Sequence, residues 1–127
     1  MNLEKVVFGF FIVLAMTLNF GFFVGDIANP AYHHPYELFA AIVVNLVATV
    51  LKFGDRTQIG AIHLSTSLVA DLQLIAAGIV WVAMGDVGAG TASASVTVSI
   101  VSLSGGALLA NITSVILLIG ETFMLRR

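Results

Sequence analysis

The stretch STSLVADLQLIAAGIVW, from Ser65 to Trp81, is apolar enough for the interior of a membrane but carries Asp71 near its middle. A membrane-spanning helix needs about 20 mostly apolar residues. An ionised side chain at the bilayer centre costs about 2.5–3.5 kcal/mol on insertion scales. A carboxylate at this depth therefore faces a partner, a cavity or water, and it is the first candidate for a functional residue.

Composition places the whole chain in the membrane class. Of its 127 residues, 59% are hydrophobic and 9% are charged, whereas soluble domains carry about 25% charged residues. We therefore expect an all-α integral membrane protein with one transmembrane domain, residues 1–127, embedded in the lipid bilayer. The absence of cysteine excludes disulfides and cysteine-ligated metals. A net charge of −2 gives no reason to expect nucleic acid as a partner.

Four segments are long and apolar enough to span a bilayer. We predict helices over Val6–Val24, Tyr36–Phe53, Ile59–Met84 and Val96–Leu125, joined by connections in which glycine and proline mark turns. Short connections make sequential helices antiparallel. The run from Thr91 to Ser99 alternates polar and apolar residues, which favours an extended or re-entrant segment before the last helix.

All five basic residues fall at one end of this predicted bundle. Lys5 precedes the first helix, Lys52 and Arg56 lie between the second and third, and Arg126 and Arg127 end the chain. Because cytoplasmic loops of membrane proteins carry an excess of lysine and arginine, both termini and the middle connection are expected on the cytoplasmic side. A cleaved signal peptide is the alternative for the first helix, but no small-residue cleavage site follows it.

The two halves of the chain resemble each other. AIVVNLVATVLKFGD (residues 41–55) aligns with ALLANITSVILLIGE (residues 107–121), and VGDI and MGDV close the first and third helices. The aligned pairs are Asn45 with Asn111, Gly54 with Gly120, and Asp55 with Glu121. We predict a tandem parallel repeat of two helical hairpins, about 1–56 and about 59–127, related by an axis along the membrane normal. Chance similarity between apolar segments is the alternative. Aligning the Gly-Asp ends places Phe11 opposite Asp71.

Helical periodicity gives the third helix two polar or small faces. His63, Ser67 and Asp71 share one face, which leads from the cytoplasmic end to the middle of the membrane. Gln73 lies on the opposite side. Both faces cannot contact lipid, so the helix is expected to be buried in the bundle or in an oligomer.

Asparagines lie midway along the second and fourth helices. Asn45 forms a stripe with Thr49 and Lys52 that also leads to the cytoplasmic end, and Asn111 occupies the fourth helix. An interhelical hydrogen bond of about 0.6 kcal/mol is the structural alternative for both asparagines. The candidate ion pathway consists of Asp71, Gln73, Asn45, Asn111, Ser67 and His63.

Small residues recur every three or four positions along the fourth helix, a spacing that lets helix backbones approach closely. We predict a helix-packing seam made of Ser102, Gly106, Ala110 and Ser114. A pore wall of hydroxyl groups beside the flexible Gly105-Gly106 pair is the alternative.

Two adjacent histidines, His33 and His34, lie between the first and second helices with Asp26 and Glu37 nearby. Imidazole and carboxylate groups bind divalent metals, so the histidines are a candidate metal site. A solvated loop is the simpler explanation.

Sequence motifs of catalysis are missing. The chain has no GxSxG, HExxH or phosphate-binding loop. His63, Ser67 and Asp71 are stacked along one helix and have no oxyanion donor beside them. We therefore predict that the protein is not an enzyme and needs no cofactor.

Three segments of the chain resemble segments of a family of small four-helix bacterial inner-membrane proteins of unassigned function. They are MNLEKVVFGFFIVLAMTLNFGFF, KFGDRTQIGA and SLVADLQLIAAG. The resemblance implies a multi-pass protein of the bacterial inner (cytoplasmic) membrane and brings no activity with it. The chain also has the size of the small multidrug exporters, but their essential carboxylate lies in the first helix, where this chain has only Asn19. The rotor-ring proteolipids place their acid in the last helix, whereas Asp71 is in the third.

These patterns favour an oligomeric channel or transporter for a monovalent cation or a proton. Asp71 would attract the ion, amide oxygens would assist it, and His63 and Ser67 would line the approach. If the third helix surrounds an axis in a homo-oligomer, Asp71 becomes a ring of carboxylates, a known basis of cation selectivity. The alternatives are a non-conducting scaffold that grips a partner membrane subunit and a proton-coupled exporter of small molecules.

Overall fold

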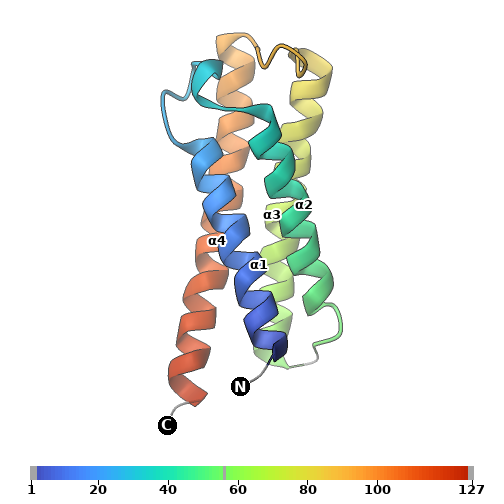
Figure 1. Cartoon of the computed structure of the whole chain (residues 1–127), viewed down its shortest axis with the longest axis vertical. Helices are drawn as coiled ribbons and strands as arrows, with labels where there is room; N and C mark the ends of the chain where they lie inside the picture. The colour runs from blue at the N-terminus through green and yellow to red at the C-terminus, as the bar shows by residue number, and fades with distance from the viewer. Residues whose placement is uncertain (1–2, 56, 126–127) are drawn as a thin grey trace.

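Four helices make up almost all of the computed structural model, which describes residues 3–55 and 57–125 (Figure 1). They are α1 (Leu3–Phe23), α2 (Pro35–Lys52), α3 (Gln58–Met84) and α4 (Ala94–Leu125), and a short 3-10 helix, η1 (Pro30–Tyr32), precedes α2. All four α-helices are long and apolar enough to span a membrane. The all-α class and the four predicted helices are therefore confirmed, and their length and composition suggest a multi-pass membrane protein.

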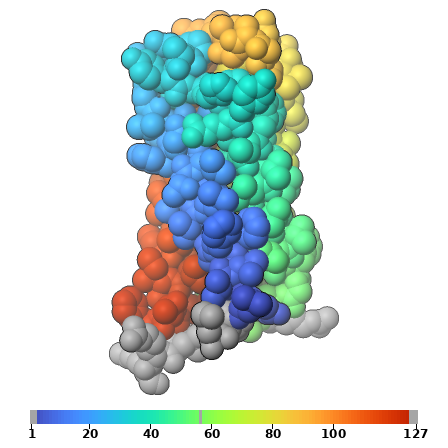
Figure 2. Space-filling model, viewed as in Figure 1, coloured from blue at the N-terminus to red at the C-terminus, as the bar shows by residue number. Residues whose placement is uncertain are grey.

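The helices form an up-and-down bundle. α1 packs against α2, α2 against α3, α3 against α4, and α4 returns to α1. The first residues of α1 and α3 and the last residues of α2 and α4 lie together at one end, called here the basic end because it holds Lys5 and Lys52 (Figure 1). The α1–α2 and α3–α4 connections lie at the other, loop end. On the face drawn in Figure 2, α1 lies between α2 and α4.

Local sequence explains where the helices begin. The Thr57 hydroxyl accepts the Gly60 N–H at 3.0 Å and caps α3. The His34 side chain accepts the Tyr36 N–H at 3.2 Å, and Pro35 occupies the first helical position of α2, where its missing N–H is not needed. The observed starts of α2 and α3 therefore lie one residue before the predicted ones.

The predicted extended or re-entrant segment over Thr91 to Ser99 is wrong for most of its length. An isolated bridge joins Thr91 to Asp86, and α4 begins at Ala94. Hydroxyl groups explain the difference, because the Thr97 and Ser99 side chains donate to backbone carbonyls one turn earlier. The polar residues of the alternating run thus bond to the helix that they belong to.

Apolar side chains face both the outside and part of the inside of the bundle. The loop half of the interior holds a cluster, called here the apolar plug, of Phe22, Leu38, Ala41, Ala70, Leu74, Ala77, Trp81, Ile100, Val101 and Ala107. A smaller cluster of Phe8, Ile12 and Ala48 lies toward the basic end. Large apolar residues such as Leu72 and Phe123 are 71% and 66% exposed, which suits a surface in contact with lipid.

Polar side chains are concentrated inside the bundle. The buried polar residues are Asn19, His33, Asn45, Thr49, Lys52, His63, Ser67, Asp71, Thr97, Ser104, Asn111 and Ser114. Polar and ionisable side chains within membrane segments usually face the bundle interior in this way and mark functional positions.

Candidate functional site

Asp71 is held between α2 and α3. Its carboxylate accepts a hydrogen bond from the Asn45 amide at 2.6 Å on Oδ1 and one from the Thr49 hydroxyl at 2.6 Å on Oδ2. Asn45 and Thr49 are four residues apart on α2, so both face α3. Asp71 is only 6% exposed. Asp71 and Asn45, two residues of the predicted ion pathway, are thus in contact inside a single chain.

Neutral oxygens surround this carboxylate. The Asn45 amide also donates to the backbone carbonyl of Ser67 at 3.2 Å, one turn before Asp71 on α3. Asn45 Oδ1 and Ser67 Oγ are buried and have no hydrogen-bond partner among the described residues. Within residues 3–55 and 57–125, no lysine, arginine or histidine forms an ion pair with Asp71. The arrangement of one carboxylate and several neutral oxygens is able to accept a proton or a monovalent cation.

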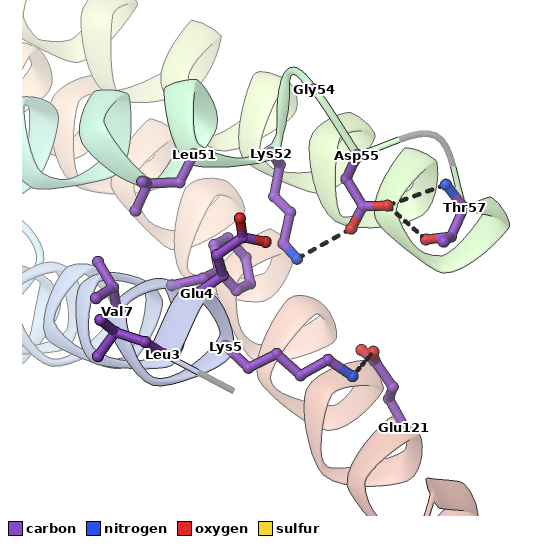
Figure 3. Close-up of a pocket in the computed structure, with 11 residues that line it drawn as sticks. Leu3, Glu4, Lys5, Val7, Leu51, Lys52, Gly54, Asp55, Thr57 and Glu121 are labelled. Atoms are coloured by element: carbon purple, nitrogen blue, oxygen red, sulfur yellow. Dashed lines mark hydrogen bonds and ion pairs between the residues drawn. The ribbon is translucent and has the colours of Figure 1, made fainter. Parts of the chain in front are cut away.

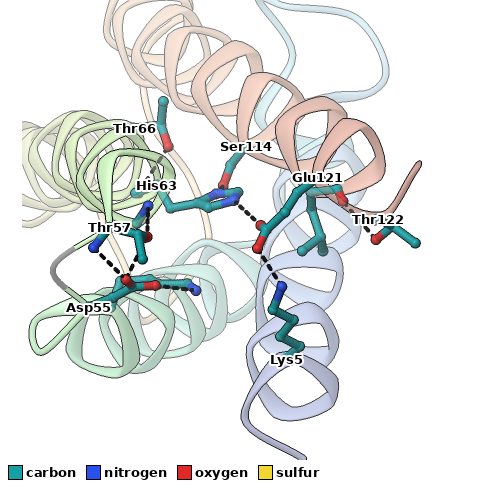
Figure 4. A network of polar contacts seen from close by, with 11 residues as sticks. Lys5, Asp55, Thr57, His63, Thr66, Ser114, Glu121 and Thr122 are labelled. Atoms are coloured by element: carbon teal, nitrogen blue, oxygen red, sulfur yellow. Dashed lines mark hydrogen bonds and ion pairs between the residues drawn. The ribbon is translucent and has the colours of Figure 1, made fainter. Parts of the chain in front are cut away.

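A second polar group leads from the basic end to the interior along α3 and α4 (Figure 4). His63 is fully buried, and its Nδ1 lies 2.7 Å from the Ser114 hydroxyl. Its Nε2 lies 3.8 Å from Glu121 Oε2, and the other Glu121 oxygen accepts from Lys5 at 2.5 Å. The edge of the Phe8 ring covers the imidazole, with 5.1 Å between ring centroids. His63 therefore lies between a charged surface and the interior.

A cavity of about 730 Å³ opens at the basic end (Figure 3). Its charged lining residues are Glu4, Lys5, Lys52, Asp55 and Glu121. Lys52 Nζ lies 3.3 Å from Asp55 Oδ2 and 4.3 Å from the centroid of the Phe8 ring. Among the described residues of the lining, three side chains are thus acidic and two are basic.

Asp55 is an anion over a wide pH range. Its Oδ1 accepts from the Thr57 hydroxyl at 2.7 Å and from the Thr57 N–H at 2.9 Å. These hydrogen bonds, with a smaller contribution from Lys52, lower the pKa of Asp55 from 3.8 to about 2. The entrance of the cavity therefore keeps this negative charge at any physiological pH.

Gln73 and Asn111 do not join Asp71. The half-buried Gln73 side chain packs on Gly106 of α4, on the side of α3 that faces away from α2. Asn111 is fully buried, and its amide makes no hydrogen bond within residues 3–55 and 57–125. Of the six predicted pathway residues, the structure brings Asp71, Asn45 and Ser67 together, and it links His63 to α4.

Two groups of predicted residues lie in different surroundings. Asp71 faces α2 inside its own bundle. In the predicted seam Ser114 is buried and Gly106 and Ala110 are half-buried, whereas Ser102 is exposed. A helix presents each face in turn, and Ser102 falls outside the arc that α1 and α3 cover.

The histidine pair is not arranged as a metal site. His33 is fully buried, and its two ring nitrogens lie 2.6 Å and 2.7 Å from the backbone carbonyl oxygens of Phe22 and Asp26. His34 is exposed and caps α2. No group of three metal-binding side chains occurs in the described part of the chain. Backbone carbonyls thus occupy the nitrogens that a metal would need.

Several contacts of the site do not follow from the sequence pattern. Thr49 shares a stripe with Asn45 but lies outside the predicted pathway, and Glu121 is known from the sequence only as the repeat partner of Asp55. The Asn19 and Ser104 side chains, which bond at 2.7 Å between α1 and α4, form a further buried polar pair. The spacing of four residues from Asn45 indicates that Thr49 faces the same way. Glu121 and Ser104 contact residues far away in the sequence, so spacing along one helix does not predict their contacts.

Comparison with known proteins gives a family but no activity. Residues 32–122, most of the chain, match the family described as a family of unknown function, DUF6394. No curated protein and no solved structure matches the chain.

Proposed function

We propose that this chain, which belongs to the DUF6394 family of unknown function, carries a proton or a monovalent cation at Asp71 inside a membrane. One observation supports this most strongly. Asp71 is 6% exposed, is hydrogen-bonded by two neutral side chains, and has no cationic partner in residues 3–55 and 57–125. A carboxylate in apolar surroundings must be paired or neutralised. A proton or a bound cation does this.

The ligand set favours a small monovalent ion. Asp71 supplies one charge, and the unpartnered Asn45 Oδ1 and Ser67 Oγ supply neutral oxygens beside it. Calcium takes six to eight oxygen ligands and several carboxylates. A single carboxylate with neutral oxygens suits a proton or an ion such as sodium better.

Access to Asp71 is proposed from the basic end. Among its described lining residues the cavity there has three acids and two bases, and the Glu121–His63–Ser114 contacts lead inward from it. Between Asp71 and the loop end the interior holds the apolar plug and the buried Asn19–Ser104 pair. A carrier that opens to one side at a time agrees with this mainly apolar loop half better than a continuous pore.

We further propose that the four helices cross a bacterial inner membrane with both termini in the cytoplasm, and that the two hairpins are a tandem repeat. The repeat accounts for the buried, unpartnered Asn111. Asn111 corresponds to Asn45, but the position equivalent to Asp71 is Phe11, so Asn111 has no carboxylate to bind. In a homo-oligomer each bundle would keep its own Asp71 site.

A scaffold without transport is the second candidate, and a specific observation favours it. Both oxygens of Asp71 already accept hydrogen bonds from α2, so the carboxylate also serves to join two helices. In this case Asp71 would fix the bundle for a partner membrane subunit.

Cation flux in proteoliposomes distinguishes the two. Wild type, Asp71→Asn and the loop variant Asp86→Asn are reconstituted, and proton and sodium uptake are followed with fluorescent indicators. The carrier predicts uptake above that of protein-free liposomes, loss of uptake in Asp71→Asn, and normal uptake in Asp86→Asn. Absence of wild-type uptake, or uptake that survives in a folded Asp71→Asn protein, overturns the carrier and favours the scaffold.

A further inference from the structure

Lys52 lies on the same face of α2 as the two residues that hold Asp71. Thr49 and Asn45 precede it by about one and two helical turns, and all three side chains are buried. Lys52 is only 8% exposed, yet its ammonium extends toward Asp55 in the cavity (Figure 3). A nearly buried cation therefore lies between the basic-end cavity and the Asp71 carboxylate.

The helix geometry directs this lysine toward Asp71. Side chains of a helix lean toward its N-terminus, and α2 begins at the loop end. The Cα–Cβ bond of Lys52 thus leans toward Thr49. Cβ atoms three residues apart are about 5–6 Å from each other, and a four-carbon stem covers about one helical turn of 5.4 Å. Because Thr49 Oγ is 2.6 Å from Asp71 Oδ2, a Lys52 rotamer that follows α2 toward Thr49 would place the ammonium near that oxygen.

Asp55 does not depend on Lys52. The Lys52–Asp55 contact is 3.3 Å long, whereas Thr57 donates two shorter hydrogen bonds, of 2.7 Å and 2.9 Å, to the other oxygen of Asp55. The low pKa of Asp55, about 2, has Thr57 as its main cause. Asp55 therefore stays ionised and hydrogen-bonded when the ammonium moves away.

We propose that Lys52 competes with the carried cation for Asp71. This inference rests on the proposed function. When Asp71 is ionised and holds no other cation, the Lys52 ammonium leaves Asp55 and pairs with Asp71 Oδ2. A proton or monovalent cation that binds Asp71 returns the ammonium to Asp55. The lysine thereby neutralises a buried carboxylate that would otherwise be costly to leave unpaired.

Chemical labelling of Lys52 tests the pairing without transport. Full-length protein in lipid nanodiscs is treated with an amine-reactive reagent at one pH with choline as the only added cation, and each lysine is quantified by mass spectrometry. Lys5 lines the same cavity and is the internal reference. We expect Asp71→Asn to raise the ratio of Lys52 to Lys5 labelling severalfold, because the ammonium then stays in the cavity. An unchanged ratio overturns the proposal.

A wild-type comparison covers the case in which Asp71→Asn does not fold. The same labelling ratio is measured in sodium and in choline, and at pH 6 and pH 8, values of our choosing. Sodium or the lower pH should raise the ratio of Lys52 to Lys5 labelling. A ratio that changes with neither sodium nor pH overturns the proposal. Within residues 3–55 and 57–125, the other charged or titratable groups around Lys52 are Glu4 and Lys5 of α1, Asp55 of the α2–α3 connection, His63 of α3 and Glu121 of α4.

Flux measurements separate competition from a structural role. Lys52→Gln removes the competing charge and should lower the half-saturating cation concentration severalfold, whereas Lys52→Arg should stay close to wild type. A half-saturating concentration that is unchanged or higher in Lys52→Gln contradicts competition. A cation flux that is the same in wild type and in Asp71→Asn overturns the proposed function itself. Flux that depends on Asp71 with an unchanged labelling ratio overturns the role of Lys52 alone.

Discussion

Thr49 is able to serve both protonation states of Asp71. Its hydroxyl lies 2.6 Å from Asp71 Oδ2 and 3.0 Å from the backbone carbonyl of Asn45. A hydroxyl has one proton and two lone pairs, so it donates to an ionised Asp71. When Asp71 is protonated, the carboxyl donates to Thr49 and the hydroxyl turns to the carbonyl. The site thus gains or loses a proton without leaving Oδ2 unpartnered.

Replacing Thr49 tests this arrangement. Thr49→Val removes the hydroxyl and should destabilise the protein by about 1–3 kcal/mol, the cost of leaving a buried polar group unpaired. It should also reduce flux, since one protonation state of Asp71 loses its partner. Thermal unfolding in detergent and proteoliposome uptake measure the two effects. Thr49→Ser keeps the hydroxyl and should behave as wild type; a Thr49→Val protein equal to Thr49→Ser would show that the hydroxyl is dispensable.

Gly106 should be required for the packing of Gln73, and α4 offers a matched control. A Cβ at Gly106 would overlap the Gln73 side-chain amide, whereas a Cβ at Gly120 has no neighbour within 4 Å. Alanine is a better helix former than glycine by about 1 kcal/mol. Gly120→Ala should therefore leave the free energy of unfolding unchanged or raise it. The Gly106→Ala protein should have a lower free energy of unfolding than the Gly120→Ala protein.

A double variant identifies the cause of that difference. Combining Gly106→Ala with Gln73→Ala removes the overlapping amide and should restore much of the stability lost in Gly106→Ala, relative to Gln73→Ala alone. Unfolding curves in detergent give the four free energies of the cycle. If the two changes add without coupling, the contact between α3 and α4 does not explain the need for glycine.

Periodicity predicted which polar residues share a face, but not which faces meet. The stripes Asn45–Thr49 and Ser67–Asp71 follow from a spacing of four residues on each helix. Their contact depends on how α2 and α3 rotate against each other, which the packing of the whole bundle decides. The same limit applies to Gln73, which contacts α4 because Gly106 leaves space for it.

His33 should matter more for the first hairpin than its neighbour. The buried His33 ring lies between the carbonyl of Phe22 in α1 and that of Asp26 in the connection, at 2.6 Å and 2.7 Å. His33→Ala leaves these carbonyls without the ring and should cost about 1–3 kcal/mol. His34→Asn, at an exposed position, keeps a side chain that can cap α2; it is the control and should cost less. Equal unfolding midpoints for the two variants would contradict a role for the buried ring.

Thr57 should control the acid titration of Asp55. The folded-state pKa of Asp55 is about 2, below its ordinary value of 3.8, mainly because of hydrogen bonds from Thr57. A lowered carboxyl pKa stabilises the fold above pH 3.8, and that contribution is lost as the pH falls through about 2. Thr57→Val keeps the backbone N–H but lacks the hydroxyl, so the Asp55 pKa should rise toward 3.8. Carbon-13 NMR of the Asp55 carboxyl measures the shift. Thr57→Ser retains the hydroxyl and should titrate as wild type, and a Thr57→Val protein with an unshifted Asp55 would assign the low pKa to the Thr57 N–H and Lys52 instead.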